Sequence, residues 1–199
     1  MPAEVRPLTV DLWPALAELF SSGGDPKWCW CQYWRKPGSN WSNTTADENR
    51  DDLRAILDRD GPAPGLVALA DGKAVGWVGL GPREDFPRLA RSRTLPQLPG
   101  AVVWAVNCFV VARSARRTGV ASQLLEAAVA YAKAHGAQTV EGYPVLTDGA
   151  RISSASVYTG TAGMFERAGF EVVAPTKSKA SSGTPRVVMR RKPESRLSA

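Results

Sequence analysis

The chain has 199 residues, about the size of one domain, and its 44% apolar and 22% charged residues are ordinary for a globular protein. No uninterrupted apolar stretch is longer than residues 101–106, far short of the roughly 20 residues that span a membrane. The polar start predicts no export signal, and three cysteines predict no disulfide scaffold. We therefore expect a cytoplasmic protein without membrane association.

The net charge of +6 comes from the C-terminal end of the chain. From Lys177 onward one acid, Glu194, stands against seven basic residues: Lys177, Lys179, Arg186, Arg190, Arg191, Lys192 and Arg196. A nucleic-acid-binding domain usually carries its charge as a face or stripe of the fold. We expect a solvated basic segment and no nucleic-acid partner, and a nucleic-acid binder remains an alternative that rests on this segment.

Hydrophobic periodicity and turn residues predict a mixed succession of helices and strands. Asp11 is the candidate N-cap of the first helix, Thr45 and Glu48 have the spacing of a capping box, and Asp71-Gly72-Lys73 predicts a hairpin turn. The expected elements are helices at 8–20 and 45–59, strands at 66–70 and 74–80, a loop at 81–100, a strand at 101–112, a helix at 121–135, a strand at 138–145, a helix at 164–168, and strands at 170–173 and 186–190, with a low-complexity loop at 176–184. This order predicts a single α/β domain over residues 1–192 and a polar tail at 193–199.

The junction between the strand at 101–112 and the helix at 121–135 carries the clearest chemical signal. The first N–H groups of a helix have no intrahelical partner and lie at the positive end of its dipole. Gly119 and Ala121 have minimal side chains, so an anion can approach the backbone. Nearby positive charge comes from Arg113, Arg116 and Arg117. The junction predicts a site for a dianion or pyrophosphate, and a plain strand-to-helix turn is the alternative.

Arg116-x-x-Gly119-x-Ala121 resembles the Gln/Arg-x-x-Gly-x-Gly/Ala loop of the GCN5-related N-acetyltransferase (GNAT) superfamily. Residues 165–170, Phe-Glu-Arg-Ala-Gly-Phe, resemble the late helix end of that family. The order of the elements extends the resemblance over most of the chain. It implies an α/β (α+β) GNAT-like domain whose central, mixed and mostly antiparallel sheet is splayed at the cofactor strand and flanked by helices.

The resemblance further implies acetyl-CoA as acyl donor, with no metal. The backbone of Phe109, Val110 and Val111 would pair with the pantetheine arm as an added strand, and an N–H near Val110 would stabilise the oxyanion. A bulge in that strand would open a slot beside the strand that carries Glu141. The pyrophosphate would be held by Arg116, Arg117, Thr118, Gly119, Val120, Ala121 and Ser122.

Two candidate catalytic residues follow from the same resemblance. The family usually carries a Tyr in its late helix, which protonates the departing thiolate, but here that position is Phe165. Tyr158 lies seven residues earlier, about two helical turns, and could supply the hydroxyl. Glu141 is the best candidate for the base that deprotonates the acceptor amine, and a paired or solvated strand carboxylate is an equal alternative.

Other chemically interesting residues have simpler interpretations. His135 is placed to cap a helix, and Cys108 fits a buried apolar position better than an acylated nucleophile. Cys29 and Cys31 lack further ligands for zinc. The aromatic residues of 28–41 form either core or an acceptor wall, and the arginines of 83–93 either contact an anion or acceptor or belong to a solvated loop.

The sequence therefore predicts a cytoplasmic N-acetyltransferase that transfers acetyl directly from acetyl-CoA to an amine of a small molecule or peptide. A homodimer is compatible with this prediction. The alternative is an acyl-CoA-binding sensor or pseudoenzyme without turnover, which Phe165 favours.

Overall fold

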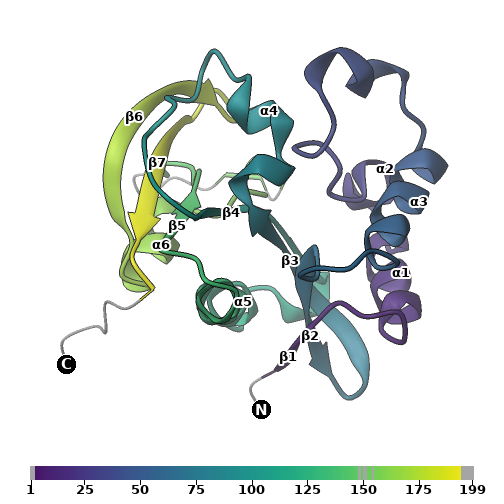
Figure 1. The fold of residues 1–199 in the computed structure, drawn as a ribbon. Coiled ribbons are helices and arrows are strands. Elements are labelled where there is room, and N and C mark those ends of the chain that lie inside the picture. The colour runs from purple at the N-terminus through teal and green to yellow at the C-terminus, as the bar shows by residue number, and fades with distance from the viewer. Residues whose placement is uncertain (1–2, 148, 150–151, 154, 194–199) are drawn as a thin grey trace.

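The computed structural model describes residues 3–147, 149, 152–153 and 155–193. Its centre is a seven-stranded sheet in the order β1-β2-β3-β4-β5-β7-β6 (Figure 1). The strands are β1 Glu4–Pro7, β2 Gly65–Ala70, β3 Lys73–Pro82, β4 Val103–Val111, β5 Thr139–Gly142, β6 Glu171–Lys179 and β7 Pro185–Arg191. Only β4 and β5 pair in parallel. The sheet is thus mixed and mostly antiparallel, as expected.

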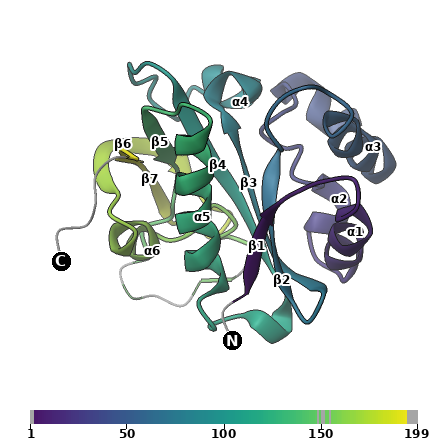
Figure 2. The ribbon, with the colours of Figure 1, turned by 60° about the horizontal axis from the view of Figure 1, so that its bottom comes forward.

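Helices cover both faces of the sheet. The helical elements are α1 Trp13–Ser21, α2 Pro26–Cys29, η1 Gly38–Asn43, α3 Ala46–Ile56, η2 Arg83–Asp85, α4 Pro87–Ala90, η3 Arg113–Ala115, α5 Val120–Ala134 and α6 Ala162–Arg167. Figure 2 shows α5 running across one face, with α6 beside it, while α1, α2 and α3 lie on the opposite side. None of the described helices is both long and apolar enough to cross a membrane.

The two faces of the sheet bury separate apolar clusters, because side chains alternate along each strand. Val78 and Leu80 of β3 pack toward α5, which presents Leu124 and Leu125. Trp77, the residue before Val78, packs on the other face with residues of α1. The parallel strand β4 divides its side chains in the same way. Each face of the sheet therefore has its own apolar cluster, packed beneath its own helices.

Local signals in the sequence are confirmed at two places. The hydroxyl of Thr45 accepts from the Glu48 N–H at 3.2 Å, and the Glu48 carboxylate accepts from the Thr45 N–H at 2.7 Å, which completes the predicted capping box of α3. Asp71 and Gly72 have φ angles of 50° and 74°. Consecutive positive φ angles are typical of the type I′ turn, which matches the twist of two antiparallel strands.

Several expected boundaries are wrong. Strand β1 was not anticipated, because it is a short edge strand with mostly exposed side chains. Asp11 is not an N-cap: α1 begins at Trp13, after Leu12, and the Asp11 carboxylate accepts from the Thr9 hydroxyl at 2.5 Å instead. The expected loop at 81–100 contains η2 and α4. Strand β6 extends through much of the expected loop at 176–184.

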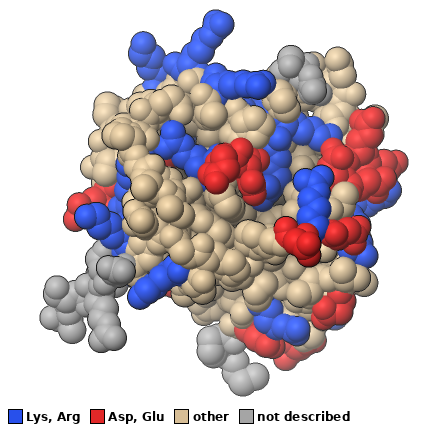
Figure 3. Space-filling view, viewed as in Figure 1, with Lys and Arg blue, Asp and Glu red and all other residues tan. Residues whose placement is uncertain are grey.

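The basic C-terminal segment is also not a solvated tail. Lys177 and Lys179 lie on β6, whereas Arg186 and Arg190 lie on β7, and Arg186 is only 6% exposed. The side chains shown in Figure 3 mix basic and acidic groups over much of the face, with Lys and Arg gathered toward its upper end. Most of the predicted tail, residues 194–199, lies outside the described residues.

Candidate active site

Strands β4 and β5 pair over only part of the length of β4. Their parallel pairing covers four residue pairs and ends at Val106 and Gly142. Directly afterwards β4 carries a bulge at Asn107, because consecutive residues of β3 pair with Val106 and Cys108. A bulge bends its strand and increases the local twist. Beyond Val106, one edge of β4 is therefore released from β5, which is the splay that the resemblance implied.

The backbone groups on the released edge follow from strand alternation. Ala112 donates its N–H to a β3 carbonyl at 2.9 Å. Phe109 donates its N–H to the carbonyl of Tyr158 at 2.6 Å on the opposite edge of β4, which is the released edge. Val110 therefore directs its N–H toward β3, and Val111 directs its N–H toward the released edge. The expected oxyanion donor at Val110 faces away from the slot, and the N–H of Phe109 is already bonded.

The segment that reaches Phe109 is a turn that lies beside β4. Its Gly160 carbonyl accepts from the Val145 N–H at 3.0 Å, and Gly160 has a φ of 86°. Tyr158 belongs to this turn, because α6 begins only at Ala162. The expectation that Tyr158 and Phe165 share a helix face is therefore wrong. Phe165 is fully buried and packs in the core.

The loop after β4 reverses direction and leads into α5. Arg117 and Gly119 have φ angles of 65° and 89°, and the Gly119 carbonyl accepts the first helical bond of α5 at 3.0 Å. A Cβ at Gly119 would meet no atom within 4 Å, so the loop is open to solvent there. The next three N–H groups precede any intrahelical acceptor and point out of the helix end; they belong to Val120, Ala121 and Ser122.

The side chains of this loop differ in their freedom. The Thr118 hydroxyl donates to the Ala115 carbonyl at 2.7 Å, and Arg116 Nε donates to the Val111 carbonyl at 3.3 Å. Arg116 therefore bends back over the released edge of β4. Arg117 is exposed. The loop thus combines open backbone donors with positive charge, which is a suitable setting for a phosphate.

Glu141 is buried in an ion cluster and is only 1% exposed. Its carboxylate accepts from Arg190 at 2.6 and 2.7 Å, lies 3.7 Å from Arg83 Nη1, and also accepts from the Tyr143 hydroxyl. Burial, together with the Glu141 charge, raises the pKa of Tyr143 well above its usual value. The geometry matches the paired-carboxylate alternative, and both carboxylate oxygens are engaged.

The same arginines fasten the long connection between β3 and β4. Arg83 donates to the Leu98 carbonyl at 3.0 Å, and Arg190 donates to the Pro99 carbonyl at 2.7 Å. Tyr143 could have been found from the sequence, because it lies two residues after Glu141 and thus on the same face of an extended segment. Arg190 could not, because its place opposite Glu141 depends on the pairing of β5 with β7.

Comparisons with known proteins agree with this arrangement. A family model described as "Acetyltransferase (GNAT) family" matches residues 26–149, more than half of the chain. The chain belongs to the GNAT acetyltransferase family. No curated protein matches the chain significantly in sequence.

Solved structures show the GNAT fold over nearly the whole chain. An N-acetyltransferase from Staphylococcus aureus Mu50 is 16% identical with a TM-score of 0.58, covering 98% of this chain and 100% of its own. A ribosomal-protein-alanine N-acetyltransferase from Brucella melitensis is 20% identical with a TM-score of 0.57, covering 95% and 99%. The NatC complex bound to Gag peptide and CoA contains a chain that is 11% identical, with a TM-score of 0.57 and coverages of 96% and 99%.

The three cysteines of this GNAT domain lie on its α1–α3 side. Cys31 and Cys108 are both buried, and their sulfur atoms are 2.8 Å apart as free thiols. Burial, and secondarily the contact with Cys108, raises the pKa of Cys31 well above its usual value. Among the described residues, no group of three or more His, Cys, Asp or Glu side chains is arranged to hold a metal ion.

The aromatic segment at 28–41 is only partly core. Trp30 is 5% exposed and belongs to the core beneath α1, whereas Trp28 is 60% exposed. Tyr33 and Trp34 line a hollow of about 330 Å³ on the same side of the sheet. Part of the segment is therefore core, and part borders a hollow that an acceptor wall would require.

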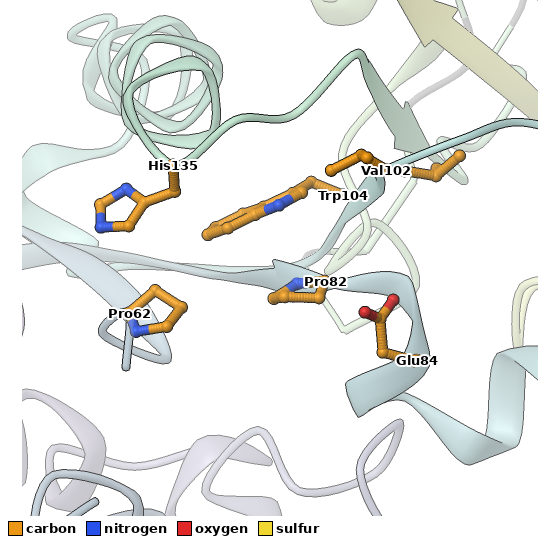
Figure 4. A pocket seen from close by; sticks show the side chains of 7 residues that line it. Pro62, Pro82, Glu84, Val102, Trp104 and His135 are labelled. Carbon is orange, nitrogen blue, oxygen red and sulfur yellow. The ribbon is translucent and has the colours of Figure 1, made fainter. Parts of the chain in front are cut away.

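A second hollow, of about 240 Å³, lies at the opposite end of β4 from the phosphate loop. Figure 4 shows His135 and Trp104 on one side of it and Pro62, Pro82 and Glu84 on the other. His135 Nδ1 donates to the Tyr131 carbonyl at 2.9 Å, in agreement with the expected helix-capping role. This hollow therefore lies away from the proposed chemistry.

Glu141→Gln should reduce the free energy of unfolding by about 3 kcal/mol, because it leaves buried guanidinium groups without their countercharge. Denaturant unfolding of the wild type and of the variant measures the difference in this free energy. Glu126→Gln is the matched control: Glu126 pairs with Arg191 at 2.8 Å but is 47% exposed, so its loss should cost less than about 1 kcal/mol. Equal effects of the two substitutions would contradict the buried cluster.

Cys31 should resist alkylation in the folded protein at pH 8. Its raised pKa keeps the thiol protonated, and each unit of increase lowers the reactive thiolate fraction about tenfold at a pH below the pKa. Peptide mapping after timed iodoacetamide treatment measures the rate at each cysteine. All three thiols should react readily in denaturant, and fast labelling of Cys31 in the folded chain would refute its protection.

Proposed function

We propose that this protein is an N-acetyltransferase that transfers acetyl directly from acetyl-CoA to the amine of a small molecule or peptide. The observation that carries the proposal is the continuity of the released β4 edge with the open N-terminus of α5. The released edge of β4 offers backbone groups for an extended pantetheine arm, and the first turn of α5 offers N–H donors for the pyrophosphate. The NatC complex, which contains a chain of similar fold, is bound to CoA and a peptide, and this supports both ligand classes.

The proposed cofactor contacts follow the chain from β4 into α5. Phe109, Val110 and Val111 form the strand that faces the pantetheine, with Val111 supplying the N–H on the released edge. The Phe109 N–H becomes available only if the Tyr158 carbonyl moves aside. The pyrophosphate is held by backbone donors and charge from Arg116, Arg117, Thr118, Gly119, Val120, Ala121 and Ser122.

The reaction requires few groups from the protein. The neutral amine attacks the thioester carbonyl, a C–N bond forms as the C–S bond breaks, and the departing thiolate accepts a proton. Positioning two reactants accounts for much of the acceleration available to such a reaction. Because both oxygens of Glu141 are engaged by Arg190 and Tyr143, we assign Glu141 a positioning role and assign the amine proton to solvent water.

Tyr158 is the proposed donor of the proton that the thiolate accepts. Burial raises the pKa of Tyr158 above its usual value, so the hydroxyl keeps its proton at neutral pH. Its ring lies 5.5 Å from the Arg186 guanidinium carbon, and its backbone carbonyl meets β4. A protonated phenol on the turn whose backbone meets the released edge supports this role for Tyr158, because Phe165 has no hydroxyl to donate a proton.

A sensor that binds acyl-CoA without turnover is the second candidate. Phe165, which has no proton to donate and is fully buried, favours it. A panel of amines incubated with acetyl-CoA and monitored for free thiol distinguishes the two functions. Thiol release that depends on an amine supports the transferase, whereas tight acetyl-CoA binding without release from any amine supports the sensor.

Gly119→Asp should weaken acetyl-CoA binding at least tenfold, about 1.4 kcal/mol, because it places a negative charge beside the pyrophosphate. Isothermal titration calorimetry measures the affinity. Gly119→Asn is the matched control, since both side chains tolerate a positive φ and differ in charge. The Asp variant should therefore bind more weakly than the Asn variant, and equal affinities would refute this placement of the phosphates.

Tyr158→Phe should lower kcat by about 10², within the usual range for general acid–base catalysis, and leave acetyl-CoA affinity almost unchanged. Steady-state kinetics and calorimetry measure the two quantities. Tyr131→Phe removes a hydroxyl of the same kind, which accepts from the Ala63 N–H at 2.8 Å, and should keep normal turnover. A Tyr158→Phe enzyme with unchanged kcat would eliminate Tyr158 as the proton donor.

A further inference from the structure

The hollow on the α1–α3 side of the sheet lies between segments that are distant in sequence. It is an open hollow of about 330 Å³, and it is lined by Tyr33, Trp34, Gly38, Arg88, Arg91, Ser92, Thr94 and Ser178. Two aromatic rings form its apolar wall, while α4, the loop after it and strand β6 supply its polar groups. A space of this size accommodates a molecule of amino-acid dimensions rather than a long polymer.

Arg88, which lines this hollow, has unused hydrogen-bond donors. Its guanidinium carbon lies 4.0 Å from the centre of the Tyr33 ring, and its Nε and Nη2 atoms are buried with no hydrogen-bond partner among the described residues. The indole N–H of Trp34 is buried and unpartnered in the same way. Buried donors are nearly always paired in folded proteins, because an unpaired one is costly. The groups that lack a partner here are donors, and they require an acceptor.

The charge around the hollow selects the kind of acceptor. The described lining residues include Arg88 and Arg91 but no carboxylate. Exposed Lys177 and Lys179 flank the lining residue Ser178, and the backbone N–H of Lys177 donates to the Thr94 carbonyl at 2.9 Å. A cationic group would find no countercharge in this lining. A carboxylate would find a planar guanidinium, which binds it in two-pronged fashion.

The hollow adjoins the proposed reaction centre. The Trp34 ring stacks on Tyr143 with centroids 6.2 Å apart, and the Tyr143 hydroxyl is bonded to Glu141 on β5. Tyr158 packs against the same apolar cluster as Trp34. A molecule held at Arg88 therefore lies on the same face of the sheet as Tyr158 and Tyr143, whose side chains pack between the hollow's aromatic wall and the strands β4 and β5.

We propose that this hollow is the acceptor subsite, and that the acceptor is a small amine that also carries a carboxylate, as in an amino acid. The inference rests on the proposed acetyltransferase function. Arg88 binds the carboxylate, Tyr33 and Trp34 contact the body of the molecule, and the amine extends toward the released edge of β4. Arg88 is thereby a specificity-determining residue.

The test compares amines that differ only by the carboxylate. L-Phenylalanine is compared with phenethylamine, and L-leucine with isoamylamine, in the free-thiol assay. The wild-type enzyme should show a kcat/KM at least about tenfold higher for each amino acid, and Arg88→Met should raise the KM of the amino acids by about 10- to 100-fold, as expected for a lost charged hydrogen bond. The kinetics of the decarboxylated amines and the affinity for acetyl-CoA should stay unchanged.

Arg93→Met, an exposed arginine of the same loop that does not line the hollow, is the matched control and should keep the preference. Arg88→Lys keeps the positive charge but lacks the planar guanidinium, so it should keep part of the preference for the amino acid over its decarboxylated amine. Circular dichroism and thermal melting establish that each variant folds. No preference for the carboxylate, or an equal change toward both members of a pair, would overturn the subsite while leaving the transferase intact.

A binding measurement separates the two proposals if no amine is acetylated. Isothermal titration calorimetry with L-leucine measures this binding in the wild type and in Arg88→Met. Weaker binding in Arg88→Met than in the wild type supports the carboxylate subsite even where the transferase proposal fails. Equal binding by the two proteins, or no binding by the wild type, refutes the subsite.

Discussion

The structure depends on the bulge at Asn107 of β4. Because the bulge follows the last parallel pair with β5, the strand bends at the point where it would otherwise continue the sheet. Gly79 on β3 faces it closely: a Cβ there would lie 3.0 Å from the Asn107 side-chain oxygen. The released edge, the direction of the following loop and the position of the α5 N-terminus all follow from this one interruption.

The buried charges organise the other side of the sheet. Glu141 holds Arg83 and Arg190, and the same arginines bond carbonyls of the connection between β3 and β4. That connection carries α4, and with it Arg88. An ion cluster inside the sheet therefore sets the position of an arginine at the edge of the proposed acceptor subsite. Its contribution to net stability is modest compared with its contribution to geometry, because desolvation offsets much of the attraction between buried charges.

The two faces divide the proposed work. The donors for acetyl-CoA come from the continuous backbone of β4 and α5, and such a site tolerates wide variation in side chains. The acceptor side is built from side chains of unrelated segments, among them Trp34, Arg88 and Ser178. This division agrees with a fold that this chain shares with solved structures at only 11–20% identity, because a backbone site survives substitutions that would change a side-chain site.

The sequence by itself determined the features that depend on neighbouring residues. The capping box at Thr45, the turn at Gly72 and the loop at Gly119 each need only a few consecutive residues, because their geometry is set by local φ angles and hydrogen bonds. The family and the order of most elements followed from such local signals. Only the tertiary structure decided that Glu141 is paired with Arg190 and that Tyr158 lies in a turn, because strand pairing and packing bring together residues that are far apart in sequence.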